Sequence, residues 1–331
     1  EPVADQMYRL WNQPGKPVKR LWGERIILEN LLYAGEDYKP APASFSELVS
    51  SADYPDSGIY IFRKEYGKEQ EGFCAVMASP KPVAHGHLDQ GSFMIYKDRI
   101  PVILDSGIEG YFDSSTQWHI SSYSHAVMQF EGAPFLSTDR NEEEINLSAG
   151  KYSRKRGWED TPGESQVKKC YLGEEEEYII LEVRRTQGAG RQIRTVYHHR
   201  ETDLYLIRDQ VLDFQGKILF SVPTVMKENH IQRNQVTGDG YYGVNLQTFF
   251  LSSTEKIWTE KGRCTPCFPA SEKIPMLSYI RAVSKSSEGF LVLISPNKER
   301  NIKTASQKEG CVVITFWQGR ELVLRLPDAE V

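Results

Sequence analysis

The stretch AHGHLDQGSF, residues 84–93, brings together side chains that can bind a metal ion or transfer a proton. His85, His87 and Asp89 alternate there, although the whole chain of 331 residues has only seven histidines. Imidazole nitrogens and carboxylate oxygens are zinc ligands, and histidine also exchanges protons near neutral pH. The stretch therefore indicates a metal site, a catalytic site or both. The alternative is a pair of strand histidines without a function.

Two further residues downstream have the right chemistry to join this stretch. Side chains two positions apart on a β-strand point to the same face, so we expect His85, His87 and Asp89 to line up. Asp105 ends the second apolar run of a pattern typical of a hairpin, and His125 opens a later apolar run. Neighbouring strand ends can bring a His, an Asp and a second His to one ion. Zinc accepts such a set and often keeps a fourth position open.

The elements that would position these residues are mainly strands. From about residue 58 the chain consists of short runs rich in Val, Ile, Tyr and Phe, separated by turn residues; examples are GIYIFR (58–63), SFMIY (92–96), PVILD (101–105), YIILEVRR (178–185) and FLVLIS (290–295). About a dozen such runs without long helices between them predict a large antiparallel β-sandwich. Before them, residues 19–35 have apolar residues at helical spacing, followed by a connector that contains proline. We expect a helical segment and linker over 1–45 and a β-domain over 46–331, with a sub-boundary near 250.

Composition excludes some classes of partner. The net charge of −5 argues against nucleic acid, although local arginines can still attract an acidic ligand. No apolar run approaches the roughly 20 residues that span a bilayer, so no membrane span is expected. The five cysteines are scattered and odd in number, which is not a disulfide framework. Cys264 and Cys267 form a lone C-x-x-C, which does not make a four-thiolate zinc site, and their role stays open.

The block AHGHLDQGSFMIYKDRIPVILDSGIEGY, with SYSHAVMQFEG after it, resembles the β-domain of the heparinase II/III superfamily of polysaccharide lyases. The shared pattern is His-x-His-x-Asp, a Ser-Phe strand, a hairpin that ends in D-x-G, and a later Ser/Thr-x-x-His. The resemblance covers about 58–250, where Asp209 also fits an Asp that closes a family strand. The chain departs from the family at Ala126, where members often have Asn.

The resemblance implies an enzyme with two parts, an (α/α) toroid followed by a β-sandwich. Such an enzyme cleaves uronic-acid-containing polysaccharides, including glycosaminoglycans, by β-elimination. It implies a structural zinc held by His87, Asp105 and His125, with His85 as the catalytic residue that faces the substrate. Residues 1–45 are too few to build the toroid. We therefore expect this chain to be the β part of a longer bacterial lyase that is periplasmic or secreted. Its partner would be the helical domain of the same protein, and without that domain the chain is expected to be inactive. Whether it forms a homodimer stays open.

Other residues have two interpretations each. Asp89 either fixes a histidine tautomer or is a surface carboxylate, and Trp118 and His119 either contact substrate or anchor a loop. His198 and His199 face opposite sides of a strand, which favours structural roles, and Arg191, Arg194 and Arg200 either meet an acidic glycan or are solvated at strand edges.

Two other functions compete with the lyase hypothesis. One is a non-catalytic carbohydrate-binding or structural β-sandwich. The other is a metallo-hydrolase, because His-x-His-x-Asp begins the metallo-β-lactamase motif, but that motif continues with His where this chain has Gln90.

Overall fold

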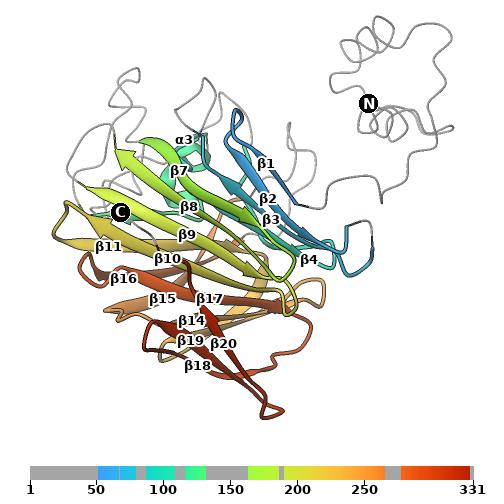
Figure 1. Ribbon diagram of the computed structural model, residues 1–331. Coiled ribbons are helices and arrows are strands. Elements are labelled where there is room, and N and C mark those ends of the chain that lie inside the picture. Colours follow the sequence, from blue (N-terminus) through green and yellow to red (C-terminus); the bar gives the residue numbers. More distant parts are fainter. Residues whose placement is uncertain are drawn as a thin grey trace, which may run out of the picture. The chain divides into compact units, whose positions relative to one another are not determined.

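The computed structural model describes residues 51–66, 68–79, 87–108, 116–131, 163–185, 190–264 and 277–328. Within these residues, twenty strands form three antiparallel sheets (Figure 1). The predicted antiparallel β-sandwich is therefore confirmed. Both the helical segment predicted over 1–45 and His85 lie outside the described residues.

The first sheet has nine strands in the order β1-β2-β3-β4-β5-β11-β16-β15, with β6 also paired to β11. Their bounds are β1 (Ala52–Tyr54), β2 (Ile59–Lys64), β3 (Gly72–Met77), β4 (Phe93–Lys97), β5 (Ile100–Ile103), β6 (Met128–Phe130), β11 (Lys217–Thr224), β15 (Lys256–Gly262) and β16 (Leu277–Lys285). The β4–β5 hairpin matches the hairpin that the sequence predicts at 92–105. It joins the second half of the sheet where Ile103 pairs with Thr224.

The second sheet has eight strands and the third has three. The eight-stranded sheet comprises, in spatial order, β12 (Met226–Gln232), β13 (Gln235–Gly240), β14 (Asn245–Phe250), β17 (Phe290–Asn297), β10 (Leu204–Leu212), β9 (Arg191–His199), β8 (Glu176–Arg185) and β7 (Gly163–Leu172). The three-stranded sheet comprises β18 (Ile302–Lys308), β19 (Cys311–Phe316) and β20 (Glu321–Arg325). Because β14 pairs with β17, one sheet continues across residue 250. The sub-boundary expected near 250 is therefore not a domain break.

The central strands of the eight-stranded sheet are buried on both faces. Ile179 and Ile207 belong to the core shared with the nine-stranded sheet. Their neighbours Ile180 and Leu206 point to the opposite side and pack with β19 and β20, which lie against this sheet in Figure 1. A strand covered on both faces needs apolar residues at consecutive positions. This requirement explains the unbroken runs YIIL and LYLI in the sequence.

A short helical segment covers the outer face of the nine-stranded sheet. It consists of α3 (Thr116–Ile120) and the 3-10 turn η2 (Ser122–Ser124), in the region where the sequence analysis places Trp118 and His119. Trp118 and Tyr123 from this segment pack with Leu219 of β11 and Tyr279 of β16 in a small separate core. That core fixes the segment that leads into His125.

Candidate metal centre

Asp105 is positioned by the end of the β4–β5 hairpin. It lies two residues beyond β5, where the N–H of Leu104 donates to the carbonyl of Pro223 at 3.2 Å. One carboxylate oxygen of Asp105, Oδ1, accepts the N–H of Gly107 at 2.9 Å. The hairpin thus sets the backbone of Asp105, and the Gly107 contact sets its side chain.

His125 is positioned by the turn after α3, not by a strand. The sequence predicts that His125 opens a strand, but it caps η2 and lies three residues before β6. The hydroxyl of Ser124 donates to the carbonyls of His119 and Ser121 at 3.0 and 2.9 Å. The hydroxyl of Tyr279 donates to the carbonyl of Ser124 at 3.0 Å. These buried bonds make a rigid support for His125, whose side chain is fully buried.

His87 is held against the same turn by the residue that follows it. The N–H of Leu88 donates to the carbonyl of Ile120 at 2.8 Å. In return, the hydroxyl of Ser122 donates to the carbonyl of Leu88 at 2.7 Å. Both polar groups of Leu88 therefore bind the α3–η2 segment, which brings His87 next to His125.

The prediction that His87 and Asp89 lie on one strand is wrong for the described part of that stretch. Residues 87–92 make a turn, and β4 begins only at Phe93. The N–H of Ser92 donates to the carbonyl of Asp89 at 2.8 Å, and Gly91 has a φ of 80°, which L side chains rarely adopt. The same alternating residues can occur in a turn and in a strand, so their spacing does not distinguish the two structures.

The three residues expected to bind zinc come together. His87, Asp105 and His125 each offer one donor atom, and these atoms all lie within 4.8 Å of one another. The imidazole rings of His87 and His125 have centroids 5.2 Å apart, and Nδ1 of His125 lies 2.7 Å from Oδ2 of Asp105. Residues that are 38 positions apart in sequence thus form one compact cluster.

The cluster has the donors that a zinc ion needs. At bond lengths of about 2.0–2.1 Å, tetrahedral ligand atoms lie about 3.4 Å apart, a spacing inside the 4.8 Å limit that holds for these three atoms. Nε2 of His125 is buried and has no hydrogen-bond partner among the described residues. A metal ion bound through Nε2 would satisfy this nitrogen, and Asp105 would have to leave its contact with Nδ1 to bind the same ion. The residues therefore fit zinc.

The protonation states also suit a metal ion. Burial, together with the neighbouring His125, lowers the pKa of His87 to about 4, so its ring is neutral at pH 7. Burial opposes ionisation of Asp105, but the charge and hydrogen bond of His125 outweigh it and hold the pKa of Asp105 at about 2. Burial likewise disfavours the charged form of His125, but Asp105 outweighs it and raises the pKa of His125. Metal binding at His125 therefore competes with a proton more strongly than at His87.

Asp89 lies at the edge of this cluster. Together with Asp105 it lines a hollow of about 190 Å³ whose other walls come from β2, β3 and β4. Burial raises the pKa of Asp89, and the charge of Asp105 acts in the same direction. Asp89 is therefore not a freely solvated surface carboxylate.

Trp118 and His119 lie behind the cluster. Trp118 is 4% exposed and meets the rings of Tyr123 and Tyr279 edge-on, at centroid distances of 5.9 and 5.6 Å. A buried ring offers no face to a sugar, so the role of loop anchor replaces that of a substrate platform. His119 is fully buried, with Nδ1 3.1 Å from the hydroxyl of Ser106. It supports the cluster from the protein side.

Two arginines near the cluster were not recognised from the sequence as parts of the site. Arg194 was interpreted as a glycan contact or a solvated edge residue, yet it is fully buried and ion-paired with Asp209. Arg281 is also fully buried and donates to the carbonyl of Tyr123 at 2.9 Å. The only sequence signal for Arg194 is its place inside an apolar run. The structural role expected for His198 is confirmed, because it is buried between two carboxylates.

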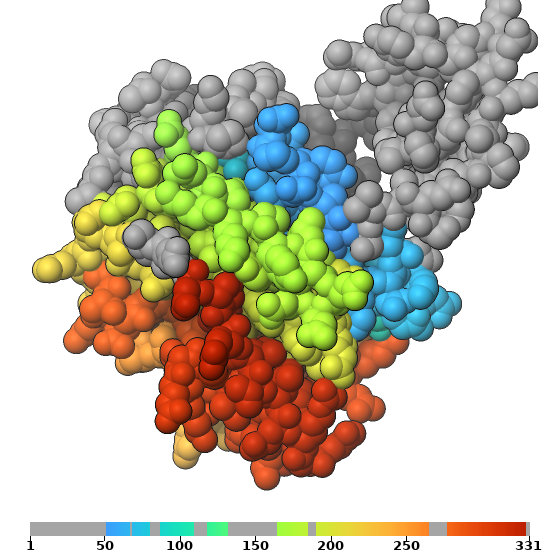
Figure 2. All heavy atoms as spheres, in the orientation of Figure 1, coloured from blue at the N-terminus to red at the C-terminus, as the bar shows by residue number. Residues whose placement is uncertain are grey.

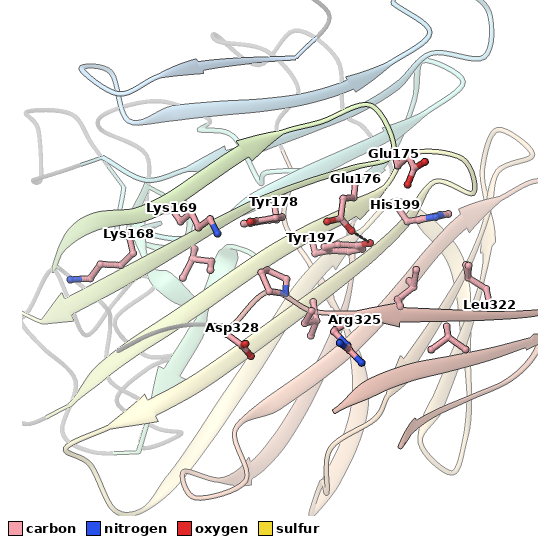
Figure 3. A pocket seen from close by; sticks show the side chains of 15 residues that line it. Lys168, Lys169, Glu175, Glu176, Tyr178, Tyr197, His199, Leu322, Arg325 and Asp328 are labelled. Atoms are coloured by element: carbon pink, nitrogen blue, oxygen red, sulfur yellow. Dashed lines mark hydrogen bonds between the residues drawn. The ribbon is translucent and has the colours of Figure 1, made fainter. Parts of the chain in front are cut away.

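A larger hollow lies elsewhere in the described part of the chain. It has a volume of about 800 Å³ and lies between β7–β9 and the segment 322–328 (Figure 3). Figure 2 shows these elements on one face, β7–β9 in green and the C-terminal strands in red. Lys168 pairs with Glu182 at 2.8 Å, Lys169 lies over the ring of Tyr178, and Tyr197 donates to Glu176. Its lining has the acidic residues Glu175, Glu176 and Asp328 beside basic ones, and it shares no residue with the metal cluster.

One family model and several solved structures match this chain. The family described as heparinase II/III-like, C-terminal, matches residues 47–212. The solved structure of heparan sulfate lyase HepC from Pedobacter heparinus superposes with a TM-score of 0.68 at 12% identity, covering 98% of this chain and 48% of that chain. A heparinase III gene product superposes with a TM-score of 0.62 at 16% identity and the same two coverages. A further heparinase III gives 0.61 at 13% identity, covering 83% and 42%.

These likenesses concern the fold, because the identities are low. The chain spans about half the length of the structures that it matches. Comparison with curated proteins gives no match. Among the described residues, no helix has the length and apolar character required to cross a membrane.

Proposed function

Because the chain belongs to the heparinase II/III-like C-terminal family, we propose that it is the β-sandwich part of a polysaccharide lyase. The substrate is a uronic-acid-containing glycan, of the heparin or heparan sulfate type or of the alginate type, and the reaction is β-elimination. A structural zinc is held by His87, Asp105 and His125. The partner is a helical domain of the same protein, and the location is periplasmic or extracellular.

The observation that carries this proposal is the cluster of three donors. Two imidazoles and one carboxylate from separate segments lie within 4.8 Å, and the buried Nε2 of His125 lacks a hydrogen-bond partner among the described residues. When bound, zinc supplies a positive charge that the three ligands share, and it thereby links the segments that carry them.

The reaction defines what the chain's own residues do. A base removes the proton at C5 of the uronate, a C4–C5 double bond forms, and the bond from C4 to the leaving oxygen breaks as that oxygen takes a proton. We assign His85 to the proton-transfer or hydrogen-bonding role, because an imidazole can serve as base or as cationic donor near neutral pH. His87, two positions later, anchors the backbone that carries His85.

The remaining groups of the reaction belong to the helical domain in this proposal. They are the group that neutralises the substrate carboxylate and a second acid or base. The isolated chain is therefore expected to hold zinc and to show little or no turnover.

Metal analysis of the purified chain tests the zinc site. We expect one zinc per chain for the natural sequence and for the control His230→Ala, because His230 is an exposed histidine outside the cluster. We expect loss of the zinc in His87→Ala and in His125→Ala. A natural chain without zinc, or a His87→Ala variant that keeps it, contradicts the proposal.

Turnover tests the lyase assignment. The absorbance of the unsaturated uronate product is followed with the chain alone, with the chain extended by its upstream coding region, and with His85→Ala in the extended protein. We expect activity in the extended protein only and its loss in His85→Ala. Vigorous turnover by the isolated chain contradicts the assigned division of the active site. An extended protein that is inactive on every uronate glycan favours the non-catalytic alternative.

A further inference from the structure

We propose that Arg194, in its pair with Asp209, is a positioning residue of the metal centre. It sets the distance between the segment that carries His87 and the segment that carries His125. This inference rests on the proposed function, since it concerns the same zinc site.

Arg194 makes four hydrogen bonds in a fully buried position. Nε donates to Oδ1 of Asp209 and one terminal nitrogen donates to Oδ2, both at 2.7 Å. The other terminal nitrogen donates to the carbonyls of Gly91 and Ala126, also at 2.7 Å. Both members of the ion pair have side chains with no exposed surface.

The two carbonyls belong to the two site segments. Gly91 lies four residues after His87, and Ala126 directly follows His125. One rigid guanidinium group therefore fixes the separation of these segments from the core side. The hydroxyl of Ser122, bonded to the carbonyl of Leu88, links the same segments at another point.

The local sequence is adapted to this contact. Asp209 lies directly opposite Arg194 in the β9–β10 ladder, which aligns the carboxylate with the guanidinium. Gly91 has a φ of 80°, which L side chains rarely adopt, and a Cβ there would be in ordinary van der Waals contact with Cδ of Arg194 at 3.6 Å. Only a planar fork of donors can serve a carboxylate and two carbonyls together, which lysine cannot do.

A buried ion pair is rarely retained for stability alone. Replacement of such a pair by apolar residues of similar volume is often neutral or stabilising, because two charges must be removed from water. A positional role explains why this pair lies against the site. Arg281, by contrast, donates to the carbonyl of Tyr123 and so supports only the segment of His125.

The test replaces both charges at once, with Arg194→Met and Asp209→Asn together. The paired change leaves no unpaired buried charge, and Asp209→Asn keeps an oxygen that can accept the amide of Gln192, which bonds Asp209 at 2.8 Å. Zinc affinity is measured by competition with a chromophoric chelator. We expect affinity 10–100-fold weaker than for the natural chain, the range typical of residues that orient metal ligands. Arg194→Lys is expected to leave affinity weakened, because charge alone does not restore the fork.

The matched control is Lys97→Met with Asp203→Asn. This second pair is partly buried and bonded through Nζ and Oδ2, and it lies at the opposite ends of β4 and β10 from the site. We expect zinc affinity within about twofold of the natural chain, although global stability changes. A purely structural role for Arg194 predicts that both paired variants behave alike.

Hydrogen exchange gives a readout that does not need zinc. In the metal-free Arg194 paired variant, we expect faster exchange in peptides covering 87–91 and 122–128, and no such local change in the control variant. A folded Arg194 variant with natural zinc affinity and natural exchange in these peptides overturns the inference. If the natural chain binds no zinc, the proposed function fails, and the exchange comparison still tests the positioning role.

Discussion

Replacing Asp105 with Asn removes two separate contributions of its carboxylate to stability. Without metal, burial opposes ionisation, but His125 and the N–H of Gly107 outweigh it and lower the pKa from 3.8 to about 2. That difference corresponds to about 2 kcal/mol. Because the side chain is 28% exposed, we reduce this figure to about 1 kcal/mol for solvent screening. The folded pKa lies below the unfolded value, so the contribution is complete at pH 7 and is lost as the pH falls from about 4 towards 2.

The second contribution depends on zinc. A ligand present at about 100 times its Kd stabilises the folded state by about 2.7 kcal/mol. With an unfolding entropy of about 2.1 cal/mol/K per residue, 1 kcal/mol changes the Tm of a protein of this size by about 1.5 °C. Zinc should therefore raise the Tm of the natural chain by roughly 4 °C. Asp105→Asn should lower Tm by about 1.5 °C in chelator and abolish most of the increase caused by zinc.

Scanning calorimetry at pH 7, in chelator and at fixed free zinc, separates the two contributions. Asp213→Asn is the matched control, because Asp213 bonds Arg191 at the surface and is 64% exposed. It should change Tm little and keep the full effect of zinc. If Asp105→Asn keeps the natural response to zinc, Asp105 is not a ligand. If its Tm in chelator equals that of the natural chain, the assigned stabilisation by His125 is wrong.

Three further substitutions test other parts of the structure. Asp203→Asn removes the buried carboxylate that binds His198 and should cost about 3–5 kcal/mol in urea unfolding at pH 7. Burial opposes ionisation of Asp203, but its hydrogen-bonded neighbours outweigh burial and lower the pKa of Asp203. The difference in unfolding free energy between the variant and the natural chain should therefore narrow as the pH falls below about 4. A difference that stays constant with pH would refute this. Trp118→Ala should cost about 3–5 kcal/mol in the same assay, and an unchanged stability would show that the ring is not an anchor. Gly91→Ala and Gly243→Ala both place a side chain at a φ near 80°, and each should lower stability by about 1–2 kcal/mol. Only Gly91→Ala should also weaken zinc binding. Equal zinc affinities of the two variants would contradict the importance of the 89–92 turn.

Much of the fold is predictable because strand burial leaves a direct pattern in the sequence. In β2 every second residue is buried, and the sequence IYIFRK shows the mixed pattern of a strand covered mainly on one face. In β8 the run YIIL is buried throughout, as a strand between two sheets requires. The pattern does not say which partner covers which face. The contact of Ile180 with the three-stranded sheet, for example, depends on strands more than 100 residues later.

The site divides in the same way between local chemistry and long-range contacts. His87, Asp105 and His125 could be selected from the sequence because ligand chemistry belongs to the side chain and the hairpin before Asp105 is local. Their backbone setting could not be predicted. His87 precedes a turn, and His125 follows a 3-10 turn that is held by Tyr279. The same alternating residues can occur in a turn or in a strand. Which of the two forms at His87 depends on hydrogen bonds from segments distant in the sequence.

The amino-acid sequence alone therefore established which side chains can bind the ion, and the tertiary structure established that they converge and what holds them together. Arg194 shows the physical reason. Its burial requires Asp209, 15 residues away, and the carbonyls of Ala126 and Gly91, 68 and 103 residues away. Only the completed sheet brings these groups to one guanidinium. A charged residue that resembles a solvated strand edge in sequence is, in the folded chain, bonded to both segments that carry His87 and His125.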